Sequence, residues 1–205
     1  MLQLIAMITM FLDHLGIVLD ILPLRFIGRL SMPLYAYMVI QGLSKTNDFQ
    51  RMQKRYLIIA AAAQLPFMVV TYERFGICFN VCFTWYLCTN IIHYTDDHSK
   101  LQFIKMLLSF FALLMIPTDY GLIALCWCFL WYLHKDINLC GCIGLALPII
   151  VLSLSTNDYI QLLSFAAVPL VLIIEKYGKI YINKKYRIVW RLFYPLHLGV
   201  LACLR

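Results

Sequence analysis

The sequence predicts an all-α protein, a polytopic transmembrane helix bundle, and three observations support this class. Of the 205 residues, 63% are hydrophobic and only 13% are charged, whereas a soluble domain carries about 25% charged residues. Apolar runs recur from the first residue to the last. No polar stretch between them is longer than a short loop, so we expect a single integral membrane domain over residues 1–205.

Apolar runs long enough to cross a bilayer define the expected helices. A spanning helix needs about 20 predominantly apolar residues, with about 17–25 as the usual range. Nine runs fit best, although the fifth to seventh are short and eight or ten spans also fit. The expected spans are residues 2–22, 25–43, 56–72, 76–93, 101–116, 120–134, 138–154, 159–175 and 188–204.

Local signals support the boundaries of several spans. The first run lacks the basic start and the small-residue cleavage site of a signal peptide, so we interpret it as a retained helix. The basic loop "SKTNDFQRMQKR" separates the second span from the third, and "EKYGKIYINKKYR" separates the eighth from the ninth. The polar turn "TDYG" opens the sixth span, with Asp119 as a candidate N-cap.

The two basic loops predict the orientation of the chain. Cytoplasmic loops of membrane proteins carry an excess of Lys and Arg. Six expected spans separate the two loops, an even number, so both loops reach the same side. We therefore expect a cytoplasmic N-terminus and a C-terminus outside. The net charge of +7 does not indicate a nucleic-acid partner, because the basic residues gather in loops between spans.

Ionisable residues inside the first span are the strongest indication of function. A charged side chain at mid-bilayer costs at least about 2.5–3.5 kcal/mol, so such residues face protein or water. Asp13 and His14 are adjacent and therefore point about 100° apart on a helix. One interpretation is structural, with Asp13 paired to an arginine and His14 bonded to a backbone carbonyl. The other is a functional pocket that both side chains line.

Polar residues in the second and last spans are candidates for the same site. Arg29 is a natural partner for Asp13 or Asp20, and arginine also suits a substrate carboxylate or phosphate. Tyr194 and His197 lie three residues apart, on one face of the last span. A second intramembrane histidine in so short a chain favours a site that the two histidines share.

The remaining interior polar residues leave two function classes open. Gln64, Asn80 and Asp119 are candidates for contact with a substrate, although Gln64 equally suits a hydrogen bond between helices. The cysteines lie mostly in apolar runs and lack the spacing of a zinc site, so no metal is expected. A proton-coupled transporter would use Asp and His as a proton relay, whereas a transferase would use His as a base.

A series of motifs runs through almost the whole chain. In order they are "ITMFLDHLG", "FIGRLSMPLYAYMVIQG", "AAQLPF", "NVCFTWYL", "DYGLIAL" and "FYPLHLGVLA". The most specific parts are the Asp-His pair, Gly-Arg-x-x-x-Pro and Tyr-x-x-His. Together these motifs resemble the TraX family, which is known for N-terminal acetylation of conjugative pilin and is similar to a wider group of transmembrane acyltransferases.

The resemblance implies an acetyltransferase of the bacterial plasma membrane that uses cytosolic acetyl-CoA. The acceptor would be a peptide N-terminus or a small amine or hydroxyl at or near the outer face. By resemblance His14 is the catalytic histidine, and Arg29 and His197 are pocket residues. The neighbouring carboxylate of Asp13 would stabilise the imidazolium that forms, and Arg29 or Tyr194 could stabilise the thioester oxyanion. The transporter alternative expects internal repeats, and none is evident between the two halves of the chain.

Acetyl-CoA is a polyanion, so its nucleotide end should lie near cationic side chains. The same cations suit topology control or attraction to anionic lipid equally well. The expected partners are the acyl acceptor and the lipid bilayer, and a homo-oligomer is compatible with the sequence. The candidate cations are Lys45, Arg51, Lys54 and Arg55 in the first basic loop and Lys184, Lys185 and Arg187 in the second.

Overall fold

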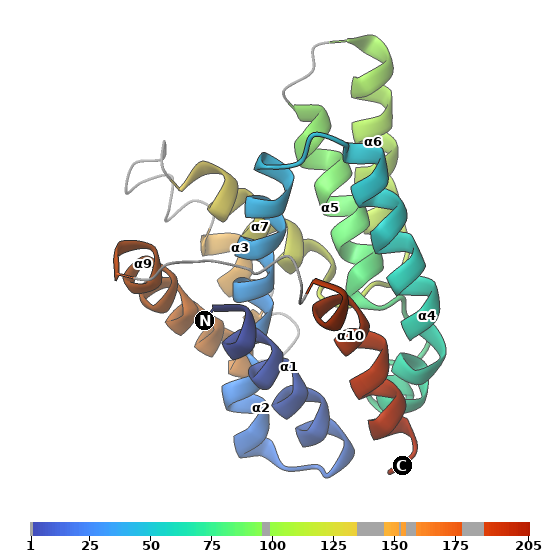
Figure 1. Ribbon diagram of the computed structural model, residues 1–205, viewed down its shortest axis with the longest axis vertical. Coiled ribbons are helices and arrows are strands. Elements are labelled where there is room, and N and C mark those ends of the chain that lie inside the picture. Colours follow the sequence, from blue (N-terminus) through green and yellow to red (C-terminus); the bar gives the residue numbers. More distant parts are fainter. Residues whose placement is uncertain (1, 96–98, 135–145, 152, 155–158, 178–186) are drawn as a thin grey trace. The chain divides into compact units, whose positions relative to one another are not determined.

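The computed structural model is helical, and it describes residues 2–95, 99–134, 146–151, 153–154, 159–177 and 187–205 (Figure 1). The all-α class is confirmed for these residues. The elements are α1 (Leu2–Val18), α2 (Leu22–Gly28), α3 (Ser31–Ser44), α4 (Phe49–Phe75), α5 (Val81–Thr95), α6 (Lys100–Met115), α7 (Gly121–Leu133), the 3₁₀ helix η1 (Tyr159–Ala166), α9 (Ala167–Tyr177) and α10 (Arg187–Ala202).

The chain divides into two compact units. The first unit comprises Met1–Tyr35, Ala62–Gly76 and Ser153–Arg205, and the second comprises Ala36–Ala61 and Ile77–Leu152. Each unit is therefore assembled from segments that lie far apart in the sequence.

Two helical segments within the described residues are long and apolar enough to cross a membrane. These are Phe49–Phe75, with 27 residues, and Tyr159–Lys176, with 18. The seventh expected span, 138–154, lies mostly outside the described residues, although 146–151 are helical. The count of nine spans therefore stays a prediction.

The second expected span, 25–43, is wrong as a single helix, because α2 ends at Gly28 and α3 begins at Ser31. Proline explains the break. Pro33 has no N–H to donate to the carbonyl of Arg29, the residue four positions before it, so the hydrogen-bond ladder is interrupted there.

The first expected span, 2–22, is also too long, because α1 ends at Val18. Asp20 follows in a turn with a φ of 53°, a left-handed conformation that Asp adopts more readily than most residues. Asp20 is exposed, so it does not join the buried face of α1.

The third expected span begins earlier than expected, since α4 starts at Phe49 rather than at residue 56. The Asp48 carboxylate accepts a hydrogen bond from the backbone N–H of Arg51 at 2.8 Å. This bond satisfies one of the free N–H groups in the first turn of the helix. Arg51, Lys54 and Arg55 therefore lie on a helix and not in a loop, which corrects the prediction.

Polar side chains join the helices of the second unit, in which α5 packs against α6 and α7. Asn80 is fully buried and donates to the carbonyl of Ala60 on α4 at 2.8 Å. The side-chain amide oxygen of Asn80 accepts from the N–H of Cys82 at 3.1 Å, so the same side chain also satisfies a free N–H at the start of α5.

The turn before α7 differs from the prediction. The N-cap of α7 is Tyr120, with a φ of 62°, so the assignment of Asp119 as N-cap is wrong. The backbone of Asp119 instead joins two segments. Its N–H donates to the Phe79 carbonyl at 2.8 Å, and its carbonyl accepts from the Thr84 hydroxyl at 2.8 Å.

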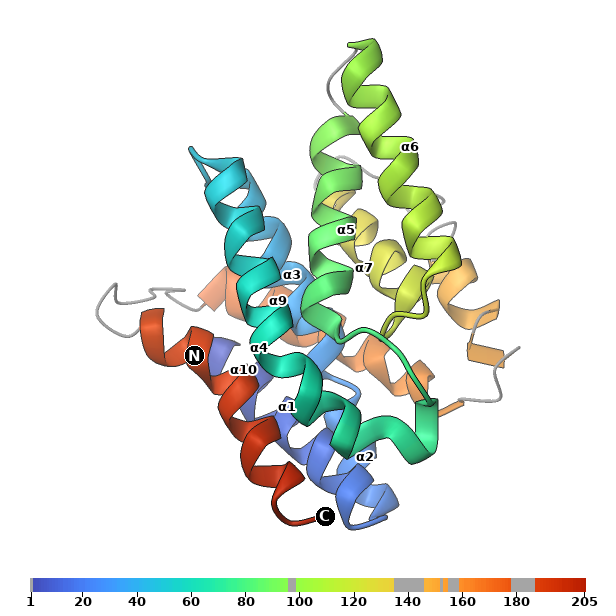
Figure 2. The ribbon, with the colours of Figure 1, turned by 90° about the vertical axis from the view of Figure 1, so that its right-hand side faces the viewer.

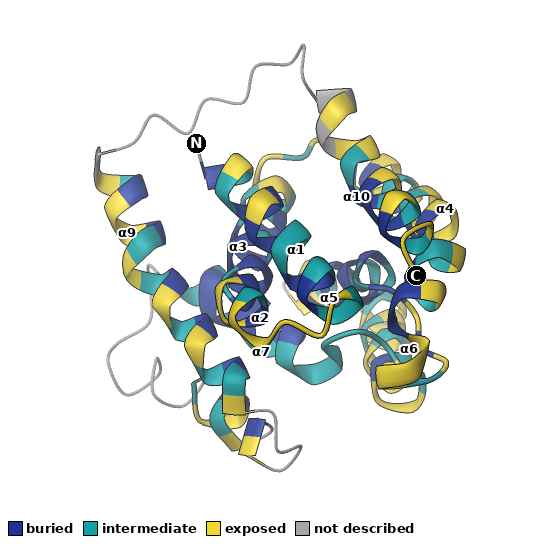
Figure 3. Cartoon of the chain, turned by 90° about the horizontal axis from the view of Figure 1, so that it is seen from below, coloured by how far each residue is buried: buried dark blue, intermediate teal, exposed yellow. Residues whose placement is uncertain are grey.

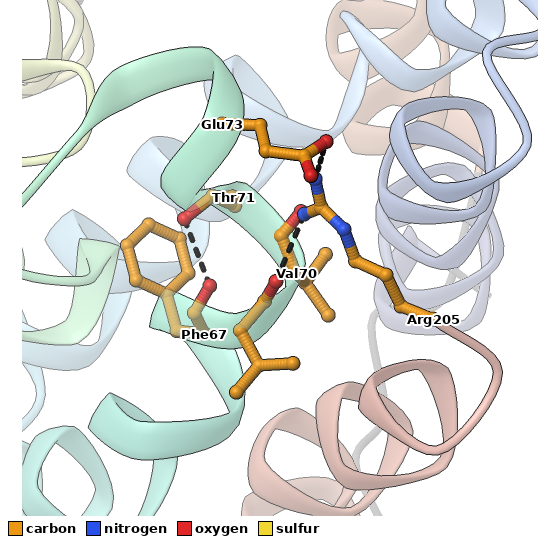
Figure 4. Close-up of polar contacts among 6 residues, drawn as sticks. Phe67, Val70, Thr71, Glu73 and Arg205 are labelled. Carbon is orange, nitrogen blue, oxygen red and sulfur yellow. Dashed lines mark hydrogen bonds and ion pairs between the residues drawn. The ribbon is translucent and has the colours of Figure 1, made fainter.

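In the first unit, α1 packs against α2 and α10. Figure 2 shows α10 beside α1, and α2 also contacts η1. Arg205 follows α10 and joins it to the C-terminal part of α4 (Figure 4). Its guanidinium donates to the carbonyl of Val69 at 2.8 Å, to the carbonyl of Val70 and to the Glu73 carboxylate.

Large apolar side chains remain exposed on several helices. The yellow parts of α6 and α9 in Figure 3 mark exposed positions. On α6 only Leu113 is buried. A water-facing surface rarely presents so many large apolar groups on one helix. The exposed ones on α6 are Leu101, Phe103, Ile104, Leu107, Leu108, Phe110, Phe111, Leu114 and Met115.

Candidate functional site

Two buried imidazoles meet between α1 and α10. Nε2 of His197 lies 3.3 Å from Nδ1 of His14, and the ring centroids are 5.1 Å apart. The two residues are only 7% and 5% exposed. The structure thus brings together the two histidines that the sequence placed 183 positions apart.

Backbone carbonyls define which nitrogen of each ring carries the proton. Nδ1 of His14 lies 2.9 Å from the Met10 carbonyl, and Nδ1 of His197 lies 2.8 Å from the Phe193 carbonyl. A carbonyl only accepts, so each neutral ring is protonated on Nδ1. Nε2 of His197 then accepts a hydrogen bond from the Nδ1–H of His14. That same N–H is shared between Nε2 of His197 and the Met10 carbonyl. Nε2 of His14 keeps its lone pair and is the basic atom of the pair.

The ring of His197 is held by aromatic neighbours on its own helix. The Phe193 ring stacks on it, with centroids 4.8 Å apart and planes inclined by 12°. Tyr194 lies against it at a centroid distance of 5.6 Å. Tyr194, His197, Leu198 and Leu201 are all buried, and their spacing of three and four residues defines the inner face of α10.

Asp13 and two arginines are buried where α1 meets α2. Two glycines allow this close approach. A Cβ on Gly28 would lie 2.5 Å from Oδ1 and 2.6 Å from Cα of Asp13, and one on Gly16 would lie 2.8 Å from Cγ of Arg25. Asp13, Arg25 and Arg29 are 6%, 2% and 4% exposed. Sequence reasoning selected Asp13 and Arg29 for the site and missed Arg25.

Arg29 links α2 to η1. Its Nη1 donates to Oε1 of Gln161 at 3.3 Å, and Gln161 is only 1% exposed. Arg29 also lies near enough to His14 for its positive charge to act on the imidazole. Gln161 was missed from sequence, although it and Ser164 are polar residues three apart in the otherwise apolar run that follows Tyr159.

The other predicted substrate contacts are divided between the two units. Gln64 is half-buried on α4, in the part that belongs to the first unit. Asn80 and Asp119 belong to the second unit. There the Asn80 side chain bonds to the backbone of Ala60, and the backbone of Asp119 bonds to Phe79 and to the Thr84 hydroxyl. The structure therefore does not gather all the predicted substrate residues into one unit.

The predicted cofactor-binding cations of the first basic segment belong to the second unit, at the junction of α3 and α4. Lys45, Arg51 and Lys54 are exposed there, and Arg55 is half-exposed. Of the second segment, Arg187 is the first residue of α10, whereas Lys184 and Lys185 lie outside the described residues.

No group of three potential metal ligands comes together within the part of the chain that the structure describes. The cysteines described there are free thiols, and most are buried. The buried polar side chains of the first unit include the histidine pair, Asp13, Arg25, Arg29 and the η1 residues Gln161 and Ser164.

The fold and the site together define a helical protein with candidate membrane-spanning helices and a buried histidine pair. The family model described as TraX protein matches residues 1–205, the whole chain. The chain therefore belongs to the TraX family, which confirms the resemblance drawn from its motifs. Membership fits a role similar to that of a pilin acetylase. No curated protein and no solved structure matches the chain.

Proposed function

We propose that the protein is a membrane-embedded acetyltransferase that takes acetyl groups from acetyl-CoA. The observation that carries this proposal is the buried contact between His14 and His197, which leaves Nε2 of His14 unprotonated. A neutral imidazole in this state is a suitable general base. Membership of the TraX family supports the reaction class.

In the proposed reaction, Nε2 of His14 removes a proton from the acceptor amine or hydroxyl as that group attacks the thioester carbonyl. The C–S bond then breaks, and the proton passes from His14 to the departing sulfur, giving free CoA and the acetylated acceptor. While His14 is protonated, its charge is shared through Nδ1 with the Met10 carbonyl and with Nε2 of His197. His197 thereby stabilises the imidazolium, the role expected of Asp13 from the sequence.

Membrane embedding rests on the two candidate spans and on the exposed apolar side chains of α6. Contact with lipid accounts for such a surface. We place the N-terminus in the cytoplasm and the C-terminus outside, because the two basic segments belong on the cytoplasmic side. Cations of these segments, such as Lys45 and Lys54, would bind the phosphates of the donor.

The proposal is tested with the purified full-length chain in lipid nanodiscs. Release of free CoA from acetyl-CoA is followed with a thiol reagent, with and without candidate amine and hydroxyl acceptors. His14→Ala should lower turnover by about 10² or more, the usual scale for loss of a general base. His197→Ala should also lower it, since the imidazolium loses its partner.

A matched control comes from the second unit. Nδ1 of His134 also lies 2.8 Å from a backbone carbonyl, that of Trp131. His134→Ala should therefore keep wild-type turnover. Equal turnover in the His14→Ala variant and the wild type would remove His14 from the mechanism, and a wild type that releases no CoA with any acceptor would refute the proposed function.

A further inference from the structure

Two polar side chains of η1 are buried with atoms that have no hydrogen-bond partner among the described residues. These atoms are Nε2 of Gln161 and Oγ of Ser164. The residues are 1% and 0% exposed, and both lie in the candidate span Tyr159–Lys176. In a 3₁₀ helix, residues three apart are eclipsed, so the two side chains leave the helix on the same face.

The contact with Arg29 defines which end of the Gln161 amide is available. A guanidinium only donates, so the amide oxygen must be the atom that faces Arg29. The amide NH₂ group, with two donor hydrogens, is therefore directed elsewhere. Together with the Ser164 hydroxyl and the Arg29 charge, it makes a group of donors with one positive charge.

We infer that Gln161 and Ser164, with Arg29, form the site that binds the acyl carbonyl oxygen and stabilises the negative charge it acquires during transfer. This inference rests on the proposed acetyl transfer and assigns to it residues of η1 that the sequence did not indicate. The chemistry fits, because preorganised donors and a cation in a site shielded from water are what a developing oxyanion requires.

The packing of α1 on α2 connects these donors to the helix that carries the proposed base. Asp13, the residue before His14, packs on Gly28, the residue before Arg29. Arg29 then reaches Gln161 on η1, and its charge acts on His14. The base and the donors therefore belong to one connected set of contacts within the first unit.

A structural role alone does not account for the unpaired atoms. A buried donor without a partner lowers the stability of the fold, and most buried polar groups in proteins are paired. A buried hydroxyl with a structural role is paired, as Thr71 shows, since its Oγ1 donates to the Phe67 carbonyl of the same helix, α4, at 2.8 Å. A hydroxyl kept for a substrate is unpaired until the substrate binds.

The test compares kcat, KM and melting temperature for Gln161→Glu, Ser164→Ala and Thr71→Val in nanodiscs with acetyl-CoA. Gln161→Glu keeps an oxygen for Arg29 but replaces the NH₂ donor with an acceptor. Ser164→Ala removes only the hydroxyl. Each should lower kcat by about 10²–10³, the range for loss of one oxyanion donor, with KM nearly unchanged.

Stability provides the readout that separates a reactive role from a structural one. Ser164→Ala should melt at the same or a higher temperature than the wild type, because it removes an unpaired buried group. Thr71→Val should melt lower and keep wild-type kcat. If the wild type turns over but Gln161→Glu and Ser164→Ala retain its kcat, or change only KM, this inference is wrong while the proposed function stands.

Discussion

The sharpest test of the packing in the first unit is Gly28→Ala, which adds one methyl group where α1 crosses α2. The new Cβ would lie 2.6 Å from Cα of Asp13, closer than real Cβ atoms come to neighbouring atoms. Because one of the crowded atoms belongs to the backbone, a rotation of the Asp13 side chain cannot relieve the overlap. The two helices must separate.

The expected cost follows from this geometry. Overpacking a well-packed contact typically costs about 1–3 kcal/mol. For a chain of this size, each kcal/mol lowers the melting temperature by roughly 2–4 °C, so we expect a decrease of roughly 2–12 °C. Turnover should fall as well, since His14 is adjacent to Asp13 and moves with it.

The matched control is Gly199→Ala on α10. A Cβ there would meet no atom within 4 Å, and alanine within a helix is more stable than glycine by roughly 0.5–1 kcal/mol. Thermal unfolding of both variants in nanodiscs should therefore give shifts of opposite sign. A Gly28→Ala variant that melts with the wild type would show that α1 and α2 are not in the close contact described here.

Two further predictions concern polar links that hold helices together. Asn80→Ala removes the side chain that bonds to the Ala60 carbonyl and the Cys82 N–H. It should lower the free energy of unfolding by about 1–3 kcal/mol, measured by denaturant unfolding. An unchanged denaturation midpoint would refute the proposed link between α4 and α5. Arg205→Ala should lower the free energy of unfolding by about 1 kcal/mol, because it removes bonds to backbone carbonyls of α4. Glu73→Gln should leave stability nearly unchanged, because the Glu73 side chain is 82% exposed. Equal effects of the two substitutions would contradict the view that Arg205 acts through the backbone carbonyls.

The helices of the fold follow from sequence, but their ends do not follow from hydropathy. Apolar runs marked the regions that become α1 and α4 to α7. The ends depend on single groups that hydropathy does not register. Pro33 separates α2 from α3, and the Asp48 carboxylate extends α4 seven residues beyond its apolar run.

The histidines of the candidate site were found from sequence because an ionisable group in an apolar run is costly without a function. The mutual orientation of the two histidines could not be predicted from sequence, since it depends on how α10 packs on α1. Gln161 and Ser164 were overlooked because uncharged polar residues are cheap to bury when paired. Only the structure shows that each of them has a buried atom with no partner among the described residues.

The position of Asp13 changes what its charge does. From sequence, the neighbouring carboxylate was the natural partner for the His14 imidazolium, but Nδ1 of His14 already contacts Met10 and His197. Asp13 packs instead on Gly28, in the helix that buries Arg25 and Arg29. Buried cations require a counter-charge, and Asp13 is the only buried acid among the described residues.

The buried charged residues Asp13, Arg25 and Arg29 together carry a single net positive charge. In the proposed acetyl transfer, a single negative charge would develop on the carbonyl oxygen. A site with this charge balance would favour that transition state over the neutral thioester, which is the difference that accelerates a reaction. In the proposed reaction, Asp13 offsets one of the two buried positive charges, which makes it easier for the His14 imidazole to accept a proton.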